Sequence, residues 1–208
     1  MSLKPPFTLL GTFAHSPVRD HLEIIEKGLV SVDRDGSIVD VCRLGQPAYE
    51  EVLKTALSSE QLVETDTGTF IFPGMVDLHI HAPQWPQIGQ VLHRPLQEWL
   101  EQYTFPLEAR YSDTNFAKQV YKDLVSTLIA NGTTTGVYFS TIHQGATQVL
   151  AQACLDIGQR AFVGKVVMDD EEQCPDYYRD HSIDTALAGT VESIEFIRQS
   201  KNNSAALV

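Results

Sequence analysis

Two histidines stand one residue apart in residues 72–86, which read FPGMVDLHIHAPQWP. A β-strand has a side-chain period of two, so His79 and His81 face the same side if this stretch is a strand. Two imidazoles on one face could share a divalent metal ion, because neutral ring nitrogens are common zinc ligands. The same spacing also fits two hydrogen-bonded or solvent-facing histidines. The pair is therefore a candidate metal site with a structural alternative.

The residues around the pair have the character of a buried strand. Met75, Val76, Leu78 and Ile80 make a nearly continuous apolar run. Such a run is typical of a strand in a parallel sheet that helices cover on both faces. We therefore expect residues 75–81 to form a strand that is buried on both sides.

Residues 1–68 read as a small N-terminal β module. Short apolar runs alternate with turn residues, and Asp35-Gly36 lies between two such runs, which predicts a hairpin turn. Residues 48–64 carry apolar side chains at helical spacing, so we expect a helix that lies over the module. The module is expected to be structural.

Residues 69–208 alternate between strand and helix patterns. After the strand at 75–81 and a loop-rich segment, we expect a helix at 113–132, with Asp113 as its N-cap and Gly132 at its end. The pattern continues with a strand at 133–141, a helix at 144–158, a strand at 160–169, a helix at 184–201 and the opening of a fourth strand at 205–208. Repeated units of this kind predict a parallel α/β sheet with right-handed crossovers.

Composition excludes several classes of function. The net charge of −12 and the pI near 4.9 argue against a nucleic-acid partner, which would need clustered lysine and arginine. Cys42, Cys154 and Cys174 are far apart, so we expect neither disulfides nor a thiolate zinc site, and a reducing compartment fits. The chain has no signal-peptide core and no run of about 18 apolar residues. We therefore expect a cytoplasmic protein without membrane contact.

The motif PGMVDLHIH, behind a β module and ahead of strand–helix units, resembles the amidohydrolase superfamily. In that superfamily the first barrel strand carries a His-x-His metal pair. Within it, the blocks HIHAPQ, EWLEQYTFPLEARY, GTTTGVYFSTIH and RAFVGKVVMD are similar, in this order, to the guanine deaminase family. The likeness extends over about residues 8–208.

This resemblance implies a metal-dependent (β/α)8 TIM barrel and one zinc ion that activates water. The implied reaction is hydrolysis of guanine to xanthine and ammonia in purine catabolism, by a protein that is a homodimer at full length. The implied zinc ligands are His79 and His81. The implied substrate contacts are His81, Ala82, Pro83, Gln84 and Trp85. The Gln84 amide offers a donor and an acceptor, as the mixed edge of guanine requires, while Trp85 could either stack on the base or anchor its loop.

Five further polar residues are weaker candidates or are set aside. His143 follows the second barrel strand and could line the pocket or be an ordinary loop histidine. Asp169 and Asp170 could shape the pocket or cap a helix. Lys165 is not expected to bridge metal ions, because the resemblance places that lysine on a later strand. Asp77 is expected to point away from the two histidines by strand alternation, and it is assigned to structure rather than to the metal.

The chain is expected to hold only part of a barrel. A complete barrel takes about 250 residues, and positions 69–208 supply 208 − 68 = 140. The resemblance implies that the remaining metal ligands and a proton-shuttling glutamate lie beyond Val208, so we expect no catalytic acid within the chain and no activity of the chain alone. The alternatives are a non-catalytic form that dimerises or regulates, and another deaminase of the same superfamily.

Overall fold

The computed structural model describes residues 3–203, and the chain divides into two compact units between Pro73 and Gly74. The sequence pattern changes at residue 69, and the domain boundary that we placed there stays a prediction. Between residues 3 and 203, none of the helices has the length and apolar character needed to span a bilayer.

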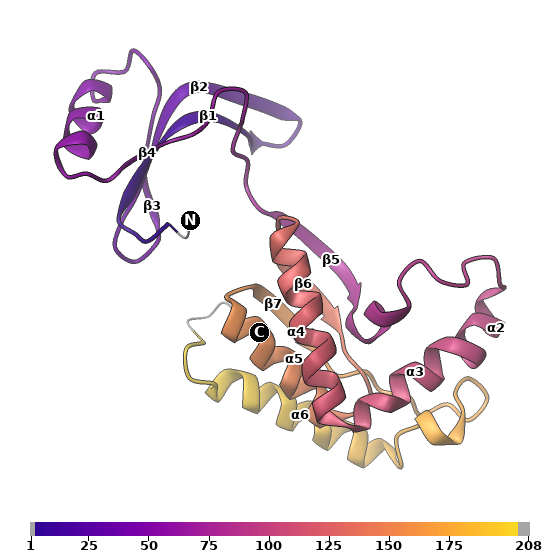
Figure 1. The fold of residues 1–208 in the computed structure, drawn as a ribbon. Coiled ribbons are helices and arrows are strands. Elements are labelled where there is room, and N and C mark those ends of the chain that lie inside the picture. Colours follow the sequence, from indigo (N-terminus) through magenta and orange to yellow (C-terminus); the bar gives the residue numbers. More distant parts are fainter. Residues whose placement is uncertain (1–2, 204–208) are drawn as a thin grey trace. The chain divides into compact units, whose positions relative to one another are not determined.

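The N-terminal unit is a four-stranded sheet with one helix (Figure 1). Its elements are β1 (Phe7–Val18), β2 (His21–Val32), β3 (Ile38–Cys42), α1 (Tyr49–Ser58) and β4 (Leu62–Glu64). The strand order is β3-β2-β1-β4, with β4 parallel to β1 and the other pairs antiparallel. The predicted hairpin turn is confirmed: Gly36 has a φ of 83°, and the Asp33 carboxylate accepts the backbone N–H groups of Asp35 and Ser37.

Helix α1 covers one face of this sheet, as predicted. Its Tyr49 packs with Leu29 and Cys42 of the sheet, and the Tyr49 hydroxyl donates to the carbonyl of Lys27 at 2.7 Å. The predicted helix is wrong at its end, because residues 62–64 form β4 and pair with β1. Leu62 is partly buried against the same cluster, so the chain after α1 returns to the sheet as a strand instead of continuing as a helix.

The C-terminal unit has a three-stranded parallel sheet of order β5-β6-β7, with helices in the connections (Figure 1). Its strands are β5 (Met75–His81), β6 (Thr133–Phe139) and β7 (Arg160–Gly164). The longer helices are α4 (Thr114–Ala130), α5 (Gln144–Ile157) and α6 (Ile183–Gln199). A shorter helical run consists of η1 (Ala82–Gln87), α2 (Leu96–Trp99), η2 (Leu100–Thr104), α3 (Phe105–Ala109) and η3 (Arg110–Ser112), and η4 (Asp176–Tyr178) precedes α6.

The helix ends follow from local sequence. The Asp113 side chain accepts the N–H of Asn115, so the predicted cap of α4 is confirmed. Gly132 follows the helix with a φ of 91°, a conformation that favours glycine. Ser182 and Thr185 form a reciprocal capping box at the start of α6.

Three expectations for this unit are wrong or incomplete. The segment between β5 and α4, expected to be loop-rich, contains the helical run from Ala82 to Ser112. Strand β5 is not buried on both sides: Leu78 is 70% exposed, because among the described residues β5 pairs only with β6. Strand β7 ends at Gly164 rather than at residue 169. The expected fourth strand at 205–208 lies outside the described residues.

Candidate metal and ligand site

His79 and His81 converge at the carboxyl end of β5. Their Nε2 atoms lie 3.0 Å apart, and both rings pack on Phe139, with centroid separations of 4.7 and 5.1 Å. Phe139 faces His81 in the parallel register of β5 and β6. The neighbouring strand therefore supplies an aromatic support that holds the two imidazoles together.

This pair has the geometry of two ligands of one metal ion. Two Zn–N bonds of ~2.0–2.1 Å at the tetrahedral angle place their nitrogens about 3.3 Å apart, and the observed 3.0 Å needs only a small adjustment. Burial, and then the neighbouring His79, lower the pKa of His81, which favours the neutral form that can bind a metal. Within residues 3–203, no third histidine, cysteine or carboxylate completes a metal-binding group.

Asp77 precedes the pair on the same strand and takes no part in it. The expectation that strand alternation points Asp77 away from the pair is wrong, because a period of two places Asp77 on the same face as His79 and His81. The parallel register of β5 is irregular between Asp77 and Ile80. The Asp77 carboxylate accepts the backbone N–H of His79 at 3.1 Å, which gives it a local structural contact.

Gln84 lies in the first turn after β5 and lines the same hollow as the two histidines. Its amide nitrogen donates to Oε1 of Glu108 at 3.0 Å, and Oε2 of Glu108 accepts the hydroxyl of Tyr178 at 2.5 Å. The structure thus places an oriented primary amide next to the candidate metal pair.

The other three residues of the predicted substrate loop make contacts within the protein. Ala82 and Pro83 are buried, and the carbonyl of Pro83 accepts the hydroxyl of Tyr111 at 2.8 Å. The indole N–H of Trp85 donates to Asp123 of α4 at 2.6 Å, while its ring packs against the core of the unit. These contacts favour the loop-anchor interpretation of Trp85 and fix the turn that carries Gln84.

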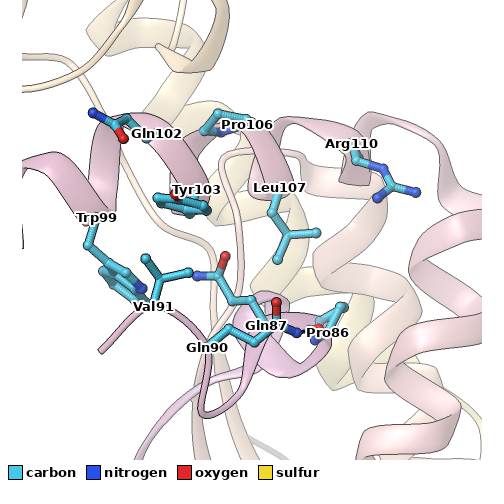
Figure 2. Close-up of a pocket in the computed structure, with 10 residues that line it drawn as sticks. All are labelled: Pro86, Gln87, Gln90, Val91, Trp99, Gln102, Tyr103, Pro106, Leu107 and Arg110. Carbon is cyan, nitrogen blue, oxygen red and sulfur yellow. Dashed lines mark hydrogen bonds between the residues drawn. The ribbon is translucent and has the colours of Figure 1, made fainter. Parts of the chain in front are cut away.

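A second hollow lies between η1 and the helices from α2 to η3 that follow it (Figure 2). Figure 2 shows Leu107 pointing from α3 toward Gln87 and Pro86. Gln87 is buried and donates to the hydroxyl of Thr104 at 2.8 Å, and Trp99 lines this hollow and that of the histidines. These helices therefore form a wall beside the site. The sequence pattern did not reveal this wall, because it predicted a loop-rich segment here.

The weaker candidates gather elsewhere. His143, Lys165 and Asp180 line a different hollow from the histidine pair, and Lys165 forms an ion pair with Asp180 at 2.9 Å. The Asp170 carboxylate accepts the N–H of Glu172, so it caps a turn rather than helix α6, which Ser182 caps. The structure does not bring these residues into contact with Gln84 or the metal pair.

Sequence reasoning missed Glu108 and Tyr178. Glu108 is 6% exposed and Tyr178 is fully buried. An acidic residue in the apolar block FPLEARY is the only signal for Glu108, and helical amphipathicity alone would leave it at the surface. Tyr178 lies 94 positions beyond Gln84, counted as 178 − 84, and carries no local signal.

Known proteins resemble this chain over most of its length. Guanine deaminase of Mus musculus is 40% identical over 176 residues, which cover 83% of this chain and 38% of that protein. The probable guanine deaminase of Schizosaccharomyces pombe is 38% identical over 90% of this chain and 35% of its own length. The crystal structure of guanine deaminase from C. acetobutylicum, with guanine bound in its active site, superposes with a TM-score of 0.82 at 31% identity.

The structural match covers 98% of this chain and 45% of the clostridial chain, so the chain spans less than half the length of these relatives. The β module and the parallel strand–helix units match the N-terminal portion of the amidohydrolase TIM-barrel fold, as predicted. The sequence model of the amidohydrolase family matches residues 70–203, which include the histidine pair, Gln84 and all three strands of the parallel sheet. The chain belongs to the amidohydrolase family.

Proposed function

We propose that the protein containing this chain is a zinc-dependent guanine deaminase, which hydrolyses guanine to xanthine and ammonia. The observation that carries the proposal is the placement of His79, His81 and Gln84 around one hollow at the end of β5. The likeness to guanine deaminase from mouse and to the probable guanine deaminase of fission yeast supports the choice of guanine among amino-substituted rings.

The residues of this chain would supply metal binding and substrate orientation. Deamination replaces the amino group of a ring carbon by oxygen from water, and a bound zinc ion lowers the pKa of water enough to make it a nucleophile at neutral pH. His79 and His81 would hold the ion through Nε2. The Gln84 amide would bind the edge of the base, where N–H donors alternate with acceptors.

Proton transfer to the leaving amine requires an acid close to the metal. The buried carboxyl group beside Gln84 is that of Glu108, and hydrogen bonds from Gln84 and Tyr178 already occupy it. We therefore assign no catalytic acid within residues 3–203. Because the chain spans less than half of the relatives, the proposal concerns the protein made from the whole gene.

The test is an ultraviolet assay of guanine loss by that protein after zinc loading, with xanthine and ammonia measured as products. Adenine serves as the control substrate, because it keeps the purine ring but presents a different pattern of donors and acceptors. We expect equimolar xanthine and ammonia from guanine and little turnover of adenine. A zinc-loaded protein that leaves guanine unchanged, or that prefers adenine, would refute the proposal.

A further inference from the structure

Glu108 links two distant parts of the C-terminal unit. It lies in α3, and its two carboxylate oxygens accept Nε2 of Gln84 at 3.0 Å and the hydroxyl of Tyr178 at 2.5 Å. Tyr178 is fully buried in η4, where its ring packs against Phe105, with 5.8 Å between the centroids. One buried carboxylate thus connects the turn after β5 with the segment after β7.

The chemistry of this carboxylate dictates how Gln84 is turned. An ionised carboxylate only accepts hydrogen bonds, so it must bind the amino side of the amide and not its carbonyl side. The bond uses one of the two N–H groups of Gln84. In the described part of the chain, the amide oxygen of Gln84 makes no hydrogen bond. The remaining N–H and the oxygen are thus left as a donor and an acceptor for a ligand.

A purely structural contact would not need a buried acid. Burial raises the pKa of Glu108 above its usual value, and the hydrogen bonds from Tyr178 and Gln84 offset only part of this increase. Over residues 3–203, Glu108 takes part in no ion pair with lysine, arginine or histidine. The hydrogen bonds to the Glu108 carboxylate therefore come from two neutral donors. A neutral side chain at this position would join the turn after β5 to the segment after β7 at a lower desolvation cost.

We propose that Glu108 and Tyr178 are positioning residues that hold the Gln84 amide in the orientation that recognises the edge of the substrate base. This assignment rests on the proposed function and adds the means by which that function selects its substrate. Tyr178 fixes the carboxylate of Glu108, and the carboxylate fixes the amide. Neither residue needs to touch the substrate.

The test uses the zinc-loaded protein made from the whole gene and compares Tyr178→Phe, Glu108→Gln and the control Tyr138→Phe. Glu108→Gln keeps the shape of the side chain but replaces an acceptor by a donor, so it cannot accept both existing bonds. The control removes another buried tyrosine hydroxyl. This hydroxyl donates to Gln159 at 2.6 Å, so its hydrogen bond involves none of Gln84, Glu108 and Tyr178. Tyr138→Phe therefore tests whether a less stable core is enough to change the kinetics.

We expect Glu108→Gln to raise KM for guanine about tenfold or more, and Tyr178→Phe to raise it less, because an oriented polar contact to the base is lost. The value of kcat and the zinc content should change little in both variants. Tyr138→Phe should lower thermal stability and leave KM within about twofold of the wild type. This division between KM and stability separates positioning from general destabilisation.

Coupling to Gln84 gives the decisive measurement. If Glu108 acts through the amide, Glu108→Gln should have no further effect on KM in a Gln84→Ala background. Additive effects would overturn the assignment, as would an unchanged KM in Tyr178→Phe and Glu108→Gln. Should Glu108→Gln fail to fold, Tyr178→Phe with Gln84→Ala provides the same cycle. A wild-type protein without guanine turnover would instead refute the proposed function, and the positioning assignment with it.

Discussion

The ion pair between Lys165 and Asp180 is the strongest candidate for a stability determinant outside the site. Its N–O distance is 2.9 Å, and the two side chains are 3% and 8% exposed. Asp180 also accepts the backbone N–H of Met168, so it closes the segment that carries Tyr178. Asp180→Asn would keep an acceptor for that N–H but would leave the Lys165 ammonium group buried without a counter-charge.

The expected loss in the free energy of unfolding is about 3–5 kcal/mol, which is typical of removing one partner from a buried ion pair. For a chain of this size, each kcal/mol lowers Tm by about 2–4 °C, so we expect a decrease of about 6–20 °C. Replacing both residues, as Lys165→Met with Asp180→Leu, should recover much of this loss. About 1 kcal/mol should remain lost, because the N–H of Met168 has then lost its acceptor.

Thermal and urea unfolding followed by circular dichroism would measure these changes. The matched control is Glu171→Gln, because Glu171 lies 4.0 Å from Arg179 and is 87% exposed, so its loss should cost less than about 1 kcal/mol. If Asp180→Asn were as stable as Glu171→Gln, the pair would be screened by water and the reasoning from burial would be refuted.

The metal pair, the chain itself, a helix cap and an acidic surface residue give the remaining predictions. His79→Ala should lower zinc content and abolish turnover of guanine, whereas Gln84→Ala should keep zinc and lower kcat/KM. Metal analysis and steady-state kinetics would compare the two variants. A histidine variant that kept zinc and activity would contradict the metal assignment. Residues 1–208 alone should show no turnover and hold well under one zinc per chain after dialysis, because the described residues offer no third ligand; stoichiometric, chelator-resistant zinc would disprove this. Asp113→Ala should lower the free energy of unfolding by about 1 kcal/mol in urea titrations, and no change would mean that the cap of α4 is dispensable. Hydrogen bonds from Arg43 and then His15 hold the pKa of Glu23 at about 2, so its contribution to stability is present above about pH 4.5 and is lost as the pH falls toward 2; Glu23→Gln should flatten the stability curve in that window, and an unchanged curve would count against it.

The sequence predicted the regular elements well where local chemistry decides them. Asp113 caps α4, Gly36 makes the hairpin turn, and the strand–helix alternation gives a parallel sheet. The sequence-based prediction was wrong where the structure of a segment depends on residues that are distant in the sequence. Residues 62–64 directly follow a helical pattern and were predicted to continue it, yet they form a strand because β1 offers a parallel edge. The apolar residues of β5 predicted burial, but burial depends on which strands and helices are present on each face.

The candidate site shows the same division. The two histidines could be found because a strand period of two is a local rule, and their convergence to 3.0 Å agrees with it. The orientation of Gln84 could not be found, because it depends on Glu108, 24 positions away (108 − 84), and on Tyr178. A buried carboxylate with two neutral donors cannot be recognised from sequence periodicity, because tertiary contacts alone supply the hydrogen-bond partners.

The candidate metal pair and the candidate recognition amide are held by different parts of the C-terminal unit. The histidines are on β5 and are supported by Phe139 of the adjacent strand, whereas the Gln84 amide is held by Glu108 of α3, which in turn accepts a hydrogen bond from Tyr178 of η4. A strand pair is fixed by its backbone ladder, but the amide orientation depends on two side-chain hydrogen bonds. Changes at Glu108 or Tyr178 should therefore alter which ring edge is bound while leaving the histidine pair in place. Under the proposed function, substrate choice can then vary independently of the metal, as is usual when loops carry recognition on a rigid sheet.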